Sequence, residues 1–189
     1  AREPGGRLAV SWPWDVGQIP IFIGQRPTGR PFDAAMRHTS KYLDMPNTPQ
    51  FPFGHGLGYT RFVYEAPKLS APTLAPGESV TVTAKASNVG ARAGSETVFL
   101  FVRDRVACVA RPTLELKGFT RIALKPGARG TVRFELKADD LVFLDADLTS
   151  MFEPGEVDIY LGPSADPARL GKATLTLVAP AKRKRAGRR

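Results

Sequence analysis

The 189-residue chain has few of the side chains that usually build metal or nucleophilic sites. It contains one cysteine, Cys108, and two histidines, His38 and His55. A single cysteine cannot form an internal disulfide, and a zinc site usually needs three or four converging ligands. We therefore expect no metal and no cofactor. Cys108 is predicted to be a buried or half-buried small apolar residue, and the two histidines are predicted to make loop contacts.

Long hydrophobic runs and common enzyme signatures are also missing. No apolar run approaches the ~20 residues of a membrane helix, and no hydrophobic stretch of a secretory signal follows Ala1. We therefore expect no membrane insertion and no signal peptide in this chain. There is no phosphate-binding glycine loop, CxxC pair, HExxH or GxSxG. The acidic clusters at 139–140 and 145–147 adjoin turns, where they are expected to cap loops and stay solvated. No complete catalytic constellation can be assembled.

The formal charge of +9 is unevenly distributed. The last eight residues carry six positive charges and no acidic residue, which leaves the remainder at +3. These six are Lys182, Arg183, Lys184, Arg185, Arg188 and Arg189. We expect a solvated, disordered basic tail, and the alternative is a tail that binds nucleic acid or another acidic surface.

Residues 63–178 alternate between apolar and polar side chains with a period of two. The clearest case is 79–87, where Val80, Val82, Ala84 and Ala86 are predicted to share one face. Turn signals containing glycine recur between such segments, at the spacing of an all-β sandwich. Strands are predicted over 79–87, 97–103, 114–124, 131–136, 155–162 and 173–178. With no convincing helix, the sequence predicts two packed antiparallel sheets with a shared apolar core.

Residues 1–62 lack this sustained alternation. Short strands are predicted over 8–12 and 17–23, and 24–50 has no periodic element, which suggests a functional loop or a segment lying on another body. Phe51–Phe62 carries glycines at 54, 56 and 58, which suggest sharp bends or close backbone approach. The aromatic residues of this part are expected to have no partner sheet of their own. They are Trp12, Trp14, Phe22, Phe32, Tyr42, Phe51 and Phe53.

Several motifs occur in one order along the chain: 6–13 (GRLAVSWP), 16–21 (VGQIPI), 28–31 (TGRP), 39–44 (TSKYLD) and the Phe51–Phe62 run. Together they resemble the C-terminal portion of a glycoside hydrolase family 3 β-glucosidase of the bacterial periplasmic type. The resemblance continues through 87–90 (SNVG), 111–112 (RP), 115–119 (ELKGF) and 140–145 (DLVFLD), which resemble the fibronectin type III-like domain of that family.

This resemblance implies an organisation in four segments. Residues 1–24 would be the end of an α/β sandwich domain, 25–62 an interdomain loop, 63–178 the immunoglobulin-like antiparallel β-sandwich and 179–189 the basic tail. It also implies retaining hydrolysis of terminal β-D-glucosyl residues, by an Asp nucleophile and a Glu acid/base that lie outside this chain. The chain alone is therefore expected to be inactive. The location implied by the family is periplasmic or secreted.

The expected partners are the catalytic domains of the same enzyme and, through them, a β-glucoside or oligosaccharide. A second copy of the chain, forming a homodimer, is a further candidate partner, and nucleic acid is not an expected one. Within the loop we nominate Arg26, Arg30, Tyr42 and Asp44 for sugar or interdomain contact, with structural salt bridges and loop anchoring as the alternative roles. The alternative function is a stand-alone fibronectin-like binding module without enzymatic activity.

Overall fold

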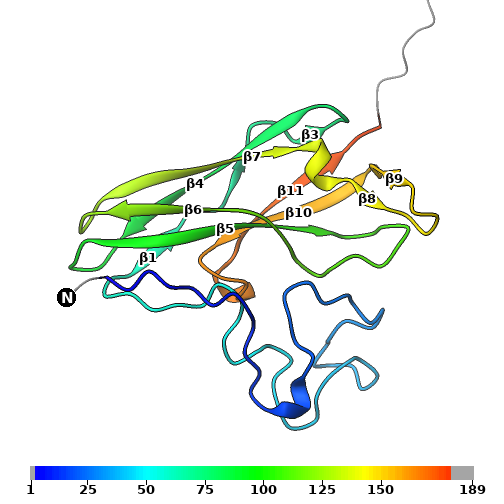
Figure 1. Cartoon of the computed structure of the whole chain (residues 1–189), viewed down its shortest axis with the longest axis horizontal. Coiled ribbons are helices and arrows are strands. Elements are labelled where there is room, and N and C mark those ends of the chain that lie inside the picture. Colours follow the sequence, from blue (N-terminus) through cyan, green and yellow to red (C-terminus); the bar gives the residue numbers. More distant parts are fainter. Residues whose placement is uncertain (1–2, 180–189) are drawn as a thin grey trace, which may run out of the picture.

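Two β-sheets, antiparallel except for the short β3–β11 pair, pack face to face in the computed structural model, which describes residues 3–179 (Figure 1). One sheet contains β4, with β7 paired along it and β1 and β2 paired with successive parts of it. The other has the order β3-β11-β10-β5-β6. The strands are β1 (Phe62–Tyr64), β2 (Lys68–Leu69), β3 (Thr73–Leu74), β4 (Ser79–Asn88), β5 (Gly94–Asp104), β6 (Glu115–Leu124), β7 (Arg129–Lys137), β8 (Phe143–Leu144), β9 (Ser150–Met151), β10 (Gly155–Gly162) and β11 (Gly171–Leu177).

The described residues contain no α-helix, and their only helical elements are three short 3-10 turns at Val16–Gln18, Ala138–Leu141 and Pro167–Arg169. No helix among them is long and apolar enough to cross a membrane. The basic tail expected from residue 179 lies, apart from Ala179, outside the described residues. The division of the chain at residues 24, 62 and 178 stays a prediction.

The alternating strands form the core between the two sheets. The predicted face of β4 is confirmed, because Val80, Val82, Ala84 and Ala86 are all buried. Val80, Val82 and Ala84 belong to one core cluster, with inward residues of β7 from their own sheet and of β5, β10 and β11 from the facing sheet. Burying a Val or Leu side chain contributes about 1.5–3 kcal/mol, so this shared cluster is the main source of stability. Its other members are Leu74, Val98, Leu100, Val102, Val132, Leu136, Ala138, Leu141, Val157, Ile159, Leu161, Leu175 and Leu177.

The outer face of the β5 sheet is also covered, which alternation alone does not predict. Phe99 and Phe101 point away from the core, yet both are buried. The ring of Phe53 lies edge-on to them, with centroids 5.5 Å from Phe99 and 6.3 Å from Phe101. The expectation that Phe53 lacks a partner sheet is therefore wrong, since it closes the outer face of the sandwich.

Further along the same face, Asp158 on β10 is buried beneath cations. Arg105 donates to its Oδ1 from Nε at 3.0 Å and from a terminal nitrogen at 2.7 Å, and Lys172 lies 2.9 Å from Oδ2. Burial alone would raise the pKa of this carboxyl, but the bonds from Arg105 and Lys172 outweigh it and hold the pKa below its ordinary value. Asp158 therefore stays ionised as the centre of an ion-pair network on the sheet.

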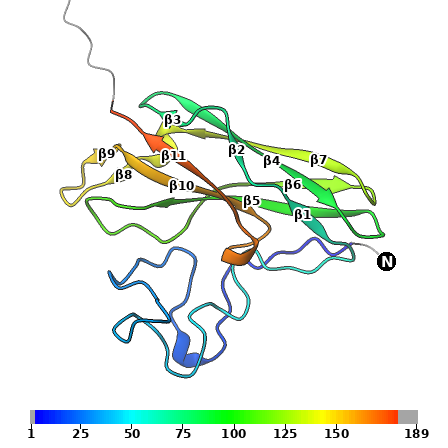
Figure 2. The same ribbon diagram turned by 180° about the vertical axis from the view of Figure 1, so that it is seen from behind.

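The first third of the chain is irregular and lies beneath the sandwich (Figures 1 and 2). The strand predicted over 8–12 is wrong, because only Trp12 forms a bridge there, to Phe51. The strand predicted over 17–23 is also wrong, since Val16–Gln18 is a 3-10 turn whose N-terminus is capped by Asp15. Both segments are apolar enough for strands, but a strand also needs a neighbouring ladder to pair with. The sandwich offers none at this place.

Candidate functional site

The segment below the sandwich, residues 9–50, is called the long loop here, and one buried side chain organises it. Gln18 is fully buried. Its Nε2 donates to the carbonyl oxygens of Pro46 at 2.8 Å and Thr48 at 3.1 Å, and its Oε1 accepts from the Trp14 amide at 2.9 Å. The Tyr42 hydroxyl donates to the Gln18 carbonyl at 3.1 Å. The long loop therefore has a defined conformation without regular secondary structure.

Two sets of hydrogen bonds hold the long loop, one at its base and one near its middle. Trp12 and Phe51 exchange backbone bonds of 2.8 and 3.2 Å. Thr113, in the connection between β5 and β6, donates to the Gln25 carbonyl from its amide at 2.9 Å and from its hydroxyl at 3.1 Å. The Trp12–Phe51 bridge thus closes the base of the loop, and the Gln25 bonds attach its middle to the sandwich.

The glycine turn, Phe51–Phe62, joins the long loop to the sandwich. Gly54 has φ of +83°, and a Cβ there would lie 2.8 Å from Cε2 of Phe99 and 3.0 Å from Cα of Ser164. Its neighbour Phe53 accepts a backbone bond of 2.8 Å from Ala165. At Gly56 a Cβ would lie 2.7 Å from Cδ of Arg7. The glycines therefore serve both purposes suggested by the sequence, a bend at Gly54 and close approach at both positions.

Residues 3–8, called the strap here, run along the sandwich and are held by the glycine turn. The Leu8 amide donates to the His55 carbonyl at 2.9 Å, and the Gly54 amide donates to the Leu8 carbonyl at 2.8 Å. Arg7 forms a salt bridge with Glu96 of β5, and their side chains are only 10% and 11% exposed. Removing one partner of an ion pair this far from water costs far more than breaking a surface pair, because it leaves the other charge buried and uncompensated.

Of the four nominated residues, the structure brings only Arg26 and Arg30 together. Both line a hollow of about 460 Å³ between the long loop and the outer face of the β5 sheet. Tyr42 has the anchoring role through Gln18 described above. Asp44 is exposed and has no hydrogen bond or ion pair within residues 3–179. Neither Tyr42 nor Asp44 lines the hollow.

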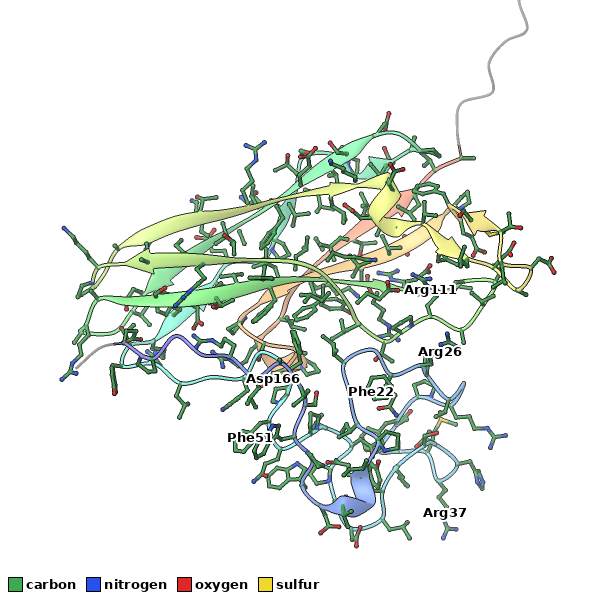
Figure 3. All side chains as sticks on the ribbon, in the orientation of Figure 1. Phe22, Arg26, Arg37, Phe51, Arg111 and Asp166 are labelled. Carbon is green, nitrogen blue, oxygen red and sulfur yellow. The ribbon has the colours of Figure 1, made fainter. Side chains whose placement is uncertain are left out.

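The hollow has a mixed lining of aromatic, cationic and hydroxyl-bearing side chains. Phe22 lies in the space beneath the sheet, and Arg26 lies beside it (Figure 3). Sequence reasoning missed the contribution of the sandwich, which adds Arg103 from β5 and Tyr160 from β10. It also missed Gln18, although the VGQIPI motif contains it. Both omissions concern contacts between segments that are far apart in the chain.

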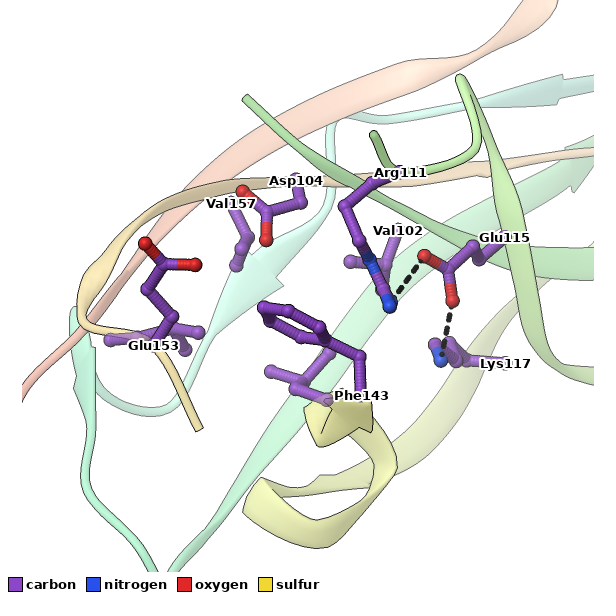
Figure 4. A pocket seen from close by; sticks show the side chains of 10 residues that line it. Val102, Asp104, Arg111, Glu115, Lys117, Phe143, Glu153 and Val157 are labelled. Carbon is purple, nitrogen blue, oxygen red and sulfur yellow. Dashed lines mark hydrogen bonds and ion pairs between the residues drawn. The ribbon is translucent and has the colours of Figure 1, made fainter. Parts of the chain in front are cut away.

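A second cluster, on the core side of the β5 sheet, gathers three carboxylates without forming a catalytic pair (Figure 4). Glu115 accepts from Arg111 at 2.6 Å and from Lys117 at 3.0 Å, and the Arg111 guanidinium lies 4.3 Å from the centre of the Phe143 ring. Burial raises the pKa of Asp104 above its ordinary value. The space there is only about 10 Å³, too small for a sugar ring, and Glu115 is paired with both Arg111 and Lys117. The cluster joins β5, β6 and the Phe143 segment.

The smaller acidic clusters cap loops as expected. Asp140 accepts from the Lys137 amide at 2.9 Å, and Asp145 accepts from the amides of Asp147 and Thr149 at 2.9 Å each. No group of three or more His, Cys, Asp or Glu side chains that could hold a metal ion occurs among residues 3–179. The ring of His55 lies 4.7 Å from that of Phe51.

Cys108 is exposed, so its predicted burial is wrong. It lies in the connection after β5, where its amide donates to Glu153 at 3.0 Å. Local desolvation and then the Glu153 carboxylate raise the pKa of the thiol above its ordinary value. The small size and apolar neighbours of this cysteine suggested a core position, but the connection turns away from both sheets.

We expect Glu153→Gln to speed alkylation of Cys108 at a fixed pH near 8. A raised pKa leaves less thiolate, which is the reactive form, and the substitution removes a negative charge that disfavours it. The rate with iodoacetamide, followed by mass spectrometry between pH 7 and 10, should show its midpoint shifted to lower pH. Glu135→Gln, on β7 of the other sheet, is the control. An unchanged rate profile for Glu153→Gln would contradict the assigned cause.

Comparisons with known proteins agree with this architecture. The family profile "Fibronectin type III-like domain" matches residues 96–165. The periplasmic β-glucosidase of Salmonella typhimurium is 37% identical over 178 residues, which is 93% of this chain and 23% of that protein. A β-xylosidase of Formosa agariphila is 41% identical over 175 residues, 93% of this chain and 24% of that protein. The crystal structure of a Listeria innocua β-glucosidase in complex with glucose superposes with a TM-score of 0.85 at 34% identity, over 93% of this chain and 24% of that one.

The chain corresponds to the C-terminal part of a glycoside hydrolase family 3 protein. It spans about a quarter of the length of the curated relatives it matches. The likeness covers the strap and long loop as well as the sandwich, since more than nine-tenths of the chain is aligned. The predicted family and the fibronectin type III-like fold are therefore confirmed.

Proposed function

We propose that this chain is the non-catalytic C-terminal part of a retaining β-glucosidase that hydrolyses terminal β-D-glucosyl residues. The observation that carries the proposal is the alignment of 93% of the chain with a β-glucosidase about four times as long. Relatives include a β-xylosidase, so the family supports a β-glycoside with glucose or xylose at the cleaved end. Glucose is favoured because the crystal structure of the similar Listeria innocua β-glucosidase is a complex with glucose.

The proposed role of the chain is structural, because the larger hollow has no carboxylate in its lining and the space beside Asp104, Glu115 and Glu153 is too small for a sugar ring. A retaining glycosidase needs two carboxyl groups roughly 5–5.5 Å apart across a site that admits a sugar ring. The buried carboxylates Glu96 and Asp158 are each held in ion pairs with arginine, and Asp104 and Glu115 line a space too small for a sugar. The nucleophile and the acid/base are therefore assigned to the part of the enzyme that precedes this chain.

The expected partner is that catalytic part, and the exposed aromatic residues of the long loop support it. Trp12, Trp14, Phe22 and Phe32 are each more than half exposed. Large exposed apolar patches usually mark interaction surfaces. A stand-alone binding module would leave these rings in water, which makes that alternative the weaker one. The relative named periplasmic supports a periplasmic or secreted location for the enzyme.

We expect the purified 189-residue chain to show no turnover of an aryl β-glucoside or an aryl β-xyloside. Typical enzymes turn over about 1–10³ times per second, so release of the chromophore from micromolar protein is a sensitive assay. The Listeria innocua β-glucosidase serves as the positive control for the assay. Turnover at an enzymatic rate by the chain alone would contradict the assignment of both catalytic carboxylates to another part of the enzyme.

A further inference from the structure

The hollow under the sandwich lies between the long loop and the outer face of the β5 sheet. Its roof is the outer face of the β5 sheet, with Arg103 and Tyr160, and its floor is the stretch 21–32 of the long loop. The Thr113–Gln25 bonds tie the floor to the connection between β5 and β6, and the Trp12–Phe51 bridge closes the base of the long loop. A volume of about 460 Å³ lies within the range that admits several side chains or one small ligand.

All the charged side chains that line this hollow are positive. Arg26, Arg30 and Arg103 line it, and its lining includes no Asp or Glu. None of the three arginines forms a salt bridge in the part of the chain that the structure describes. By contrast, Arg7, Arg105 and Lys172 each form an ion pair with a carboxylate. Three guanidinium groups around one concave, partly apolar space therefore favour an anionic occupant.

The chemistry of the lining selects a carboxylate rather than a neutral sugar. Arginine donates hydrogen bonds and accepts none, and its planar fork matches a carboxylate in a two-point contact. A glucosyl unit would need acceptors for its hydroxyl hydrogens, and the lining offers only neutral ones, such as Gln25 and Asn47, and no carboxylate. The exposed faces of Phe22 and Phe32 add apolar surface beside the guanidinium groups.

We propose that the hollow is the docking site for a carboxylate-bearing, apolar segment of the catalytic part of the enzyme. The proposal rests on the proposed function, since it takes the occupant from the three-quarters of the relatives' length that this chain does not span. The acidic side chain pairs with Arg26, Arg30 and Arg103, and apolar neighbours cover Phe22 and Phe32. The arginines fix the position of the contact, while the exposed aromatic rings supply most of the buried area.

The test is a titration of the full 189-residue chain with two soluble eight-residue peptides, one alternating Glu and Leu and the other alternating Lys and Leu. Binding is followed through the Nε–H signals of the arginines by NMR. We expect the Glu peptide to shift the signals of Arg26, Arg30 and Arg103 and to leave Arg37, which points away from the sandwich (Figure 3), unchanged. Raising the salt from 50 to 500 mM should weaken this binding at least several-fold.

Substitution of all three arginines by Gln should weaken binding of the Glu peptide at least ten-fold, while Arg37→Gln should leave it unchanged. Equal binding of both peptides, or no shift at the three arginines, would overturn the proposal. Tighter binding of a glucuronic acid disaccharide than of the Glu peptide would overturn it in favour of an acidic-sugar site. None of these results affects the hydrolysis assay, so failure of the docking site can be told apart from failure of the proposed function.

Discussion

Gly54→Ala is expected to destabilise the protein by about 2–5 kcal/mol, which makes it one of the two most damaging single substitutions considered for this fold. Two costs add together. A left-handed conformation costs a residue with a Cβ about 1–2 kcal/mol, and Gly54 has φ of +83°. Overpacking costs a further 1–3 kcal/mol or so, since the new Cβ would lie 2.8 Å from the Phe99 ring and 3.0 Å from the Ser164 backbone.

Gly77→Ala is the matched control, because it carries only the first of these costs. Gly77 has φ of +81°, almost the value at Gly54, and a Cβ there would have no atom within 4 Å. Chemical denaturation of both variants isolates the packing term as the difference between them. Equal losses of unfolding free energy would show that the glycine turn does not press on the sandwich as described.

The sequence alone could predict the sandwich because its long strands carry their own pattern. Alternation identified β4, β5, β6, β7, β10 and β11 close to their observed bounds. The strands β1, β2, β3, β8 and β9 are two or three residues long, too short for a period of two to show. β1, β2 and β3 pair with longer strands, and β8 and β9 pair with each other, so their existence depends on pairing in the assembled fold.

The site could be predicted only in part, since its contacts join distant segments. The resemblance led to the long loop and to two of the residues that line the hollow, Arg26 and Arg30. It gave no sign of Arg103 or Tyr160, because outward positions on a strand look alike whether water or a loop covers them. The burial of Phe101 and Asp158 on an outward face escaped prediction for the same reason.

Glu96→Gln is expected to cost about 3 kcal/mol of unfolding free energy, near the lower end of the range for breaking a buried ion pair. Arg7 would keep its charge in a place where its side chain is only 10% exposed, without the carboxylate that compensates it. Glu156→Gln is the control. It breaks a pair with Arg105 whose side chains are 36% and 53% exposed, and such surface pairs contribute about 1 kcal/mol or less.

Hydrogen exchange shows which amides lose protection when Glu96→Gln lowers the unfolding free energy. The Leu8 and Gly54 amides are bonded to His55 and Leu8 across the strap, so Glu96→Gln should reduce their protection more than that of the amides of β4. Replacing both partners, as in Arg7→Met with Glu96→Met, should restore most of the lost stability, because the cost comes from an uncompensated buried charge. If the double variant loses as much as Glu96→Gln, the strap is held by the shape of the pair and not by its charge, and the electrostatic account of its anchoring is wrong.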